Sequence, residues 1–144
     1  MKIKFKDYKK ILFYLLVPLL FGGLVGILNS DNFSNYDGLV SSWLFPVIWS
    51  ILYILMGFSS YLISDNKRLF NIYKVNLMVN LLWTFIFFMF NLKVFAFFWI
   101  LLLSVIVGFM IYEFYKENKF AAYLLIPYFL WLIFASILNL LQII

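Results

Sequence analysis

The side chains that could do chemistry in this chain are neutral, and they lie inside long apolar stretches. Asn76, Asn80 and Trp83 recur at intervals of four and three residues, which places them on one face of a helix. Two other stretches carry comparable sets on one helical face: Phe45, Trp49 and Tyr53, and then Tyr128, Trp131, Ala135 and Asn139. These residue types supply flat apolar surfaces and hydrogen bonds rather than acids or bases, so they indicate packing or binding.

Several classes of chemistry lack the residues they need. The chain has no His and no Cys, which removes the usual zinc ligands, thiolate nucleophiles, disulfides and the commonest haem ligands. The nearest acidic residues to the apolar stretches, Asp65 and Glu113, lie at their ends, which disfavours proton-driven transport and intramembrane hydrolysis. No phosphate-binding glycine loop or paired carboxylates are present. We therefore predict no catalytic residue, no metal site and no obligatory cofactor.

The elements that carry these side chains are predicted to be membrane-spanning helices. The chain is 67% hydrophobic, 24% aromatic and only 12% charged, a composition that no soluble domain of this length can bury. Five continuous apolar stretches approach the ~20 residues needed to cross a bilayer. Because they do not alternate, they predict helices rather than strands. We expect an all-α integral membrane protein, one domain over residues 1–144, with spans at 11–28, 44–63, 75–90, 94–112 and 121–144.

The basic residues predict the orientation in the membrane. Ten of the eleven Lys and Arg residues fall on one side of the predicted spans, and only Lys93 falls on the other. We expect a multi-pass protein of the cell membrane with a cytoplasmic amino terminus and an outside carboxyl terminus, and a first span that is retained rather than cleaved as a signal. The net charge of +5 is explained by this topology. The basic residues are dispersed among loops and attract anionic lipid headgroups equally well, so the charge does not indicate a nucleic-acid partner.

The polar and aromatic residues within the spans have structural explanations too. An Asn in hydrocarbon must find a partner, so Asn80 either joins helices across a packed seam or faces a ligand. Trp43 and Tyr61 lie near the ends of the second span, where interfacial anchoring explains them. Trp49 and Tyr53 lie deeper, where core packing or the wall of a binding site is the better explanation.

Small residues and prolines predict where helices approach one another or bend. Gly22 and Gly26 form a small-xxx-small pair that lets another helix come close, either from this chain or from a second copy. Pro18 and Pro127 lie within predicted spans, where a proline kinks the helix or frees a backbone carbonyl.

Four segments resemble the tryptophan-rich sensory protein or translocator protein family (TspO/MBR), which includes the mitochondrial peripheral benzodiazepine receptor. They are PLLFGGLVG at 18–26, WLFPVIWSILYILMG at 43–57, NLLWTFIFF at 80–88 and AYLLIPYFLWLIFASILN at 122–139, in the order found in the family. The resemblance implies a five-helix bundle, commonly a homodimer, with a pocket that opens toward the loop joining the first two helices.

The resemblance also implies a ligand class and a set of ligand-binding residues. Members bind porphyrins and other flat hydrophobic molecules, and some bind sterols or isoquinoline and benzodiazepine ligands. Carried over to this chain, the pocket residues are Trp49 and Tyr53 in the second span, Asn80 and Trp83 in the third, Trp131 and Ala135 in the fifth, and Tyr36 in the loop, where it can close over a ligand. With no His or Cys, a metalloporphyrin would be held by shape, by stacking and by Tyr or Met.

Two departures from the family pattern limit the expected function. Only DGLVSS separates Tyr36 from Trp43, where the family has a longer, proline-rich stretch, and this predicts a shorter and looser lid. The chain ends in SILNLLQII without the Tyr and basic residue of the cholesterol-recognition pattern, which argues against a sterol role.

Three functions are compatible with these residues. The first is a membrane receptor or translocator that binds tetrapyrroles for transport or stress sensing. The second is an enzyme that degrades porphyrin in the light through a Trp radical. The third is a regulatory or structural membrane partner with no small ligand.

Overall fold

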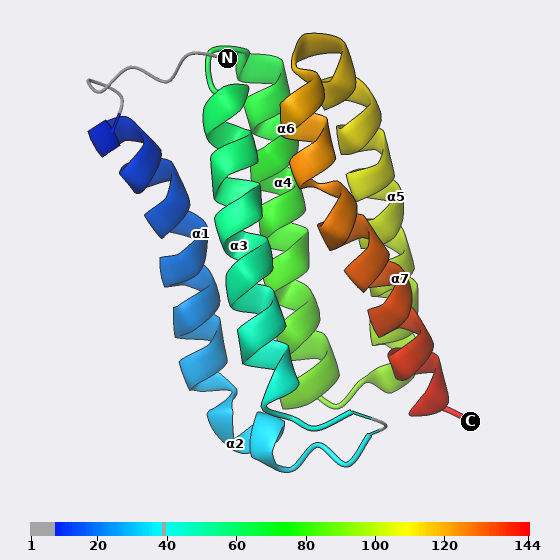
Figure 1. The fold of residues 1–144 in the computed structure, drawn as a ribbon. Helices are drawn as coiled ribbons and strands as arrows, with labels where there is room; N and C mark the ends of the chain where they lie inside the picture. The colour runs from blue at the N-terminus through cyan, green and yellow to red at the C-terminus, as the bar shows by residue number, and fades with distance from the viewer. Residues whose placement is uncertain (1–7, 39) are drawn as a thin grey trace.

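The computed structural model describes residues 8–38 and 40–144 as a bundle of helices (Figure 1). In chain order the elements are α1 (Tyr8–Leu28), α2 (Ser30–Ser34), α3 (Leu44–Leu62), α4 (Lys67–Thr84), the π-helix η2 (Phe85–Met89), α5 (Lys93–Glu117), α6 (Lys119–Leu124) and α7 (Ile126–Leu141). Five helical segments, α1, α3, α4 with η2, α5, and α6 with α7, are long and apolar enough to cross a membrane. The described residues contain no strand, so the expected all-α five-helix bundle is confirmed.

The helices lie side by side, and their connections gather at two ends (Figure 1). At the lower end of Figure 1 lie α2, the loop that follows it, the turn between η2 and α5, and the carboxyl terminus. The α3–α4 and α5–α6 connections lie at the upper end. Helix α1 packs mainly against α3 and buries only Pro18 and Val25, so the core is formed by the other four segments.

The third helix is longer than the apolar run that predicted it. It begins at Lys67 rather than at 75, because the Asn66 side chain accepts a hydrogen bond from the backbone N–H of Leu69 at 3.2 Å. An Asn in this position satisfies one of the free N–H groups of the first turn and so starts a helix. The cap lies among charged residues, outside the continuous apolar run, so the start predicted from that run was too late.

The fourth and fifth spans also differ from the predicted ranges. Helix α5 runs on to Glu117 instead of ending at 112, and in its last turns Glu113 pairs with Arg68 of α4 at 2.7 Å and with Lys116 at 3.3 Å. The side chain of Asn118 then accepts from the N–H of Ala121 at 3.1 Å and starts α6. Smaller differences occur at the first span, which begins at Tyr8, at the second, which ends at Leu62, and at the fifth, which begins at Lys119 and ends at Leu141.

The two prolines within spans behave differently. Pro127 follows the break at Leu125 that separates α6 from α7, as expected for a proline in the first turn of a new helix. Pro18 does not interrupt α1, but a proline has no N–H, so the Tyr14 carbonyl lacks the backbone hydrogen bond that it would otherwise accept from residue 18. At that level α3 carries Gly57, where an added Cβ would come within 2.5 Å of the Tyr14 oxygen. The glycine therefore lets α3 approach the backbone of α1.

Candidate functional site

A chain of buried hydrogen bonds crosses the interior of the bundle and joins three helices. The Tyr53 hydroxyl of α3 donates to Oδ1 of Asn80 on α4 at 2.8 Å, and Nδ2 of Asn80 donates to the Tyr128 hydroxyl of α7 at 2.8 Å. Tyr128 in turn donates to Oδ1 of Asn76 at 2.8 Å. Asn76, Asn80 and Tyr128 are all buried, so these amides face the bundle interior as predicted.

Aromatic rings pack around this network. The Trp49 ring stacks on Tyr53 with centroids 5.7 Å apart, and it makes edge contacts with Tyr128 at 6.2 Å and Trp131 at 6.4 Å. Trp83 lies 6.5 Å from Trp49. We call these five residues, Trp49, Tyr53, Trp83, Tyr128 and Trp131, the aromatic cluster. Their rings have rigid faces and few rotatable bonds, so they offer a preformed surface for a flat molecule.

Helix α1 closes one side of this cluster by close approach. An added Cβ at Gly22 would overlap the ring of Tyr53, so the space left by this glycine is occupied by a residue of the same chain. Gly22 and Gly26 also line a cavity of about 510 Å³ between α1 and α3, together with Trp49, Tyr53 and Thr84. That volume is in the range of small-molecule sites.

Trp83 is fixed by a second polar chain toward the lower end. Its indole Nε1 donates to Oδ1 of Asn139 at 3.3 Å, and Nδ2 of Asn139 donates to the backbone carbonyl of Lys93 at 2.9 Å. The Trp83 ring stacks on Phe87 of η2 with centroids 5.0 Å apart. The cluster is thus tied to the start of α5 and to the π-helix.

Trp131 brings an unused donor to the cluster. Its ring contacts Phe45 at 6.2 Å as well as Trp49, and its Nε1 is buried without a hydrogen-bond partner in the described structure. A buried indole N–H without an acceptor is costly, and such a group is a natural partner for a polar atom of a ligand. Ala135, one turn further along α7, is 2% exposed and keeps the side-chain volume at this level small.

Tyr36 connects the cluster to the loop after α2. Its ring contacts Phe45 at 5.0 Å and Phe88 at 6.0 Å, and its hydroxyl is buried without a partner in the described structure. The hydroxyl lies against Gly38, where an added Cβ would overlap it. Burial, with the nearby Asp37 carboxylate, raises the pKa of Tyr36 above its ordinary value, so this phenol is neutral at physiological pH and retains its proton for donation.

Comparison with known proteins identifies the family. The family model described as TspO/MBR matches residues 14–143. The chain belongs to the TspO/MBR family. It is 34% identical over 104 residues to the tryptophan-rich protein TspO of Chlorobaculum tepidum, covering 67% of this chain and 66% of that protein. It is 33% identical over 103 residues to the tryptophan-rich protein TspO of Archaeoglobus fulgidus, covering 68% of this chain and 67% of that protein.

The matched part of the chain therefore spans about two thirds of the length of each relative. Membership in the TspO/MBR family, with five helices able to cross a membrane, makes this a multi-pass membrane protein. It supports a receptor or translocator role in general.

The site residues expected from the TspO/MBR resemblance largely lie together in the structure. Trp49, Tyr53, Trp83 and Trp131 belong to the aromatic cluster, and Asn80 bonds to two of its members, Tyr53 and Tyr128. Tyr36 reaches the cluster through Phe45, which contacts both Tyr36 and Trp131.

Other residues at this TspO/MBR site were absent from the expected set. Tyr128 and Asn139 lie on the aromatic stripe of the fifth span, so the helical spacing already indicated their direction. Phe87 and Phe88 carried no signal in the sequence beyond being apolar. In the part of the chain that the structure describes, no group of three His, Cys, Asp or Glu residues lies close enough to hold a metal ion.

The hydrogen-bonded network should be necessary for stability of this TspO/MBR protein. Tyr128→Phe leaves the Asn80 and Asn76 amides without the hydroxyl, which we expect to cost about 1–3 kcal/mol. Thermal unfolding in detergent, followed by circular dichroism, measures the change. Tyr123→Phe is the matched control, because that side chain is 52% exposed and lies on α6, on the other side of the break at Leu125. Equal melting temperatures for the two variants would contradict a stabilising role for the network.

Proposed function

We propose that this protein is a membrane receptor or translocator that binds porphyrin-like or other flat hydrophobic molecules against the aromatic cluster, for transport or stress sensing. The observation that carries the proposal is that Trp83 and Trp131 converge on Trp49, whose ring packs on Tyr53 and Tyr128 of the buried hydrogen-bonded network. Rigid aromatic faces bind a flat ring system at low entropic cost. Isoquinoline and benzodiazepine compounds belong to the same class of flat apolar ligand.

Polar groups within this surface support the binding of a ligand with a few polar atoms. The free N–H of Trp131 is a donor, and the Asn80 amide is a second hydrogen-bonding group between Tyr53 and Tyr128. The cavity of about 510 Å³ borders Trp49 and Tyr53, so a guest there meets two members of the cluster. The ligand is bound reversibly and is not an obligatory cofactor.

The proposed setting is the cell membrane, with the amino terminus in the cytoplasm. Lys67, Arg68 and Lys116 lie at the upper end of Figure 1, whereas Lys93 lies at the lower end, beside the loop that follows α2. Basic residues prefer the cytoplasmic side. A homodimer is part of the same proposal, and the peripheral helix α1 carries Gly23, where an added Cβ would meet no atom of the described residues within 4 Å apart from the neighbouring residues and backbone of its own helix.

A second candidate function is photo-oxidative breakdown of a bound porphyrin. The observation in its favour is that the Trp49 ring lies 6.5 Å from Trp83 and 6.4 Å from Trp131, so that an oxidised indole has neighbours to share the charge. Porphyrin absorbance that bleaches under illumination only when these residues are intact would support the enzyme. Equal bleaching in detergent without protein would remove it.

A third candidate is a regulatory or structural partner without a small ligand. It is favoured by the direct packing of Trp49, Tyr53 and Trp131 on one another, which is a sufficient structural role for these rings. A porphyrin titration separates this candidate from the first two, because a partner without a small ligand should show no saturable binding.

We expect Trp49→Ala and Trp131→Ala each to weaken protoporphyrin binding by about tenfold, since losing a stacking face worth roughly 1.4 kcal/mol changes affinity by that factor. The shift of the porphyrin Soret band on titration measures the affinity without relying on Trp fluorescence. Trp99→Ala is the matched control, because Trp99 lies on α5, donates to the Val79 carbonyl and contacts the Phe95 ring. Unchanged affinity in both pocket variants would reject this site.

A further inference from the structure

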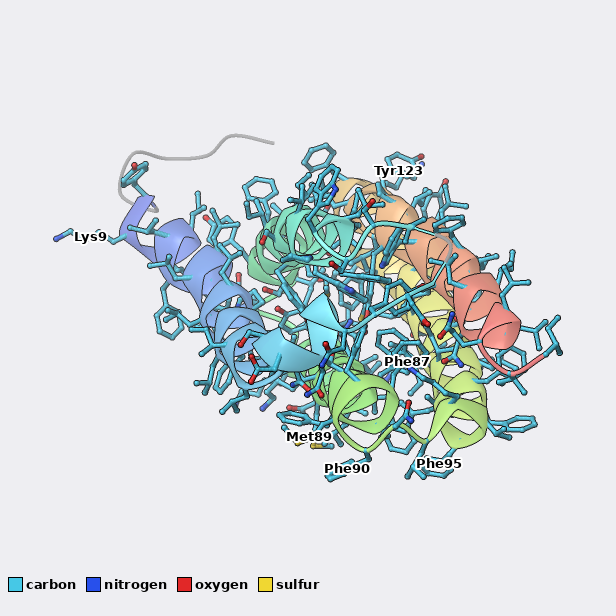
Figure 2. All side chains as sticks on the ribbon, turned by 90° about the horizontal axis from the view of Figure 1, so that it is seen from below. Lys9, Phe87, Met89, Phe90, Phe95 and Tyr123 are labelled. Carbon is cyan, nitrogen blue, oxygen red and sulfur yellow. The ribbon has the colours of Figure 1, made fainter. Side chains whose placement is uncertain are left out.

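Lys93, which the sequence marks as the single basic residue on its side of the membrane, is directed into the protein at the lower end of the bundle. Its Nζ lies 3.5 Å from the centre of the Phe87 ring and 5.7 Å from that of Phe88. The same nitrogen donates to the Phe87 carbonyl at 3.2 Å. Figure 2 views this end along the bundle, with Phe87 turned toward the interior and Met89 and Phe90 projecting outward.

The backbone around Lys93 explains this direction. In the turn after η2, the N–H of Phe90 donates to the Phe85 carbonyl at 2.8 Å, and that of Leu92 donates to the Ile86 carbonyl at 3.0 Å. Asn91 has a φ of 54°, the left-handed conformation that Asn tolerates, and reverses the chain. The next carbonyl along the chain, that of Phe87, accepts a hydrogen bond from the Lys93 ammonium.

Lys93 lines a polar cavity of about 350 Å³ at this end, together with Tyr36, Asp37, Phe88, Asn91 and Gln142. The lining also includes Asn32 and Asn35, and an ammonium group with four side-chain amides in one cavity provides the donors that a carboxylate needs. Asp37 is an exposed carboxylate in the same lining and opposes the binding of an anion. The affinity for an anion is thus set by the balance between Lys93 and Asp37.

Ring contacts through Phe45 connect the lining of this cavity to the aromatic cluster. Tyr36 and Phe88 line the cavity, and Phe45 contacts both of them as well as Trp131. The Lys93 backbone is itself bonded to Asn139, the partner of the Trp83 indole. The ring of Phe45 thus lies between Trp131 of the cluster and Tyr36 of the cavity, and the acidic edge of a molecule on the cluster has to extend past this ring to reach Lys93.

We propose that Lys93 and the amides of this cavity bind a carboxylate of the ligand, so that the protein selects amphipathic acids and orients them with the acidic edge toward the loop after α2. The proposal rests on the proposed function and adds to it the class and orientation of the ligand. Lys93 also donates a hydrogen bond to the Phe87 carbonyl, and the test has to separate that structural role from binding of the ligand carboxylate.

The test compares protoporphyrin IX with its dimethyl ester, which has the same flat body without the negative charges. We expect the wild type to bind the free acid about tenfold more tightly than the ester, in line with a charge-assisted hydrogen bond. Lys93→Gln keeps an N–H donor for the Phe87 carbonyl but removes the charge. In this variant the affinity for the acid should fall to that for the ester, while the affinity for the ester stays unchanged.

Three further variants complete the design. Lys93→Arg should keep the preference for the acid, and Asp37→Asn should increase it, because the opposing carboxylate is gone. Lys119→Gln is the matched control, since it removes one positive charge at the opposite end of the bundle and should leave the preference unchanged.

Two results would overturn the proposal, and they differ from failure of the proposed function. Equal affinity of the wild type for acid and ester would show that the cavity does not recognise the carboxylate. A preference that survives in Lys93→Gln would show that the charge of Lys93 does not provide it. If the wild type binds neither compound, the proposed function fails, and the assignment of Lys93 fails with it.

Discussion

The structure depends on one constraint, that a polar group inside a bilayer has no water to bind and must find its partner within the protein. Tyr53, Asn80, Tyr128 and Asn76 meet this constraint together through hydrogen bonds of 2.8 Å. Because these residues come from α3, α4 and α7, satisfying them fixes the three helices relative to one another. The tryptophans of the aromatic cluster lie on the same three helices, so the network also fixes their positions.

Polarity changes along the bundle in a way that matches an amphipathic guest. The interior offers ring faces and the unpaired N–H of Trp131, whereas the lower end offers Tyr36, Lys93 and side-chain amides. The α-helix gives way to the π-helix η2 between these regions, and the turn after η2 brings Lys93 over Phe87. A ligand with an apolar body and an acidic edge is complementary to both regions at once.

The sequence was sufficient for features that depend on local periodicity. Continuous apolar runs gave five helices, and the spacing of Asn76, Asn80 and Trp83 placed them on one inward face. Helix ends were harder, because the cap at Asn66 and the ion pair between Arg68 and Glu113 lie outside the apolar runs.

The direction of the Lys93 side chain could not be predicted from the local sequence. Its charge counts equally in topology wherever its side chain points, and only the turn at Asn91 directs it to Phe87.

The central claim, that a flat ligand lies on the aromatic cluster, is tested most directly by the indole N–H signals of the five tryptophans in an NMR titration with protoporphyrin. We expect the Trp49 and Trp131 signals to shift strongly while that of Trp99 stays in place. A shift confined to the exposed Trp43 would contradict the account.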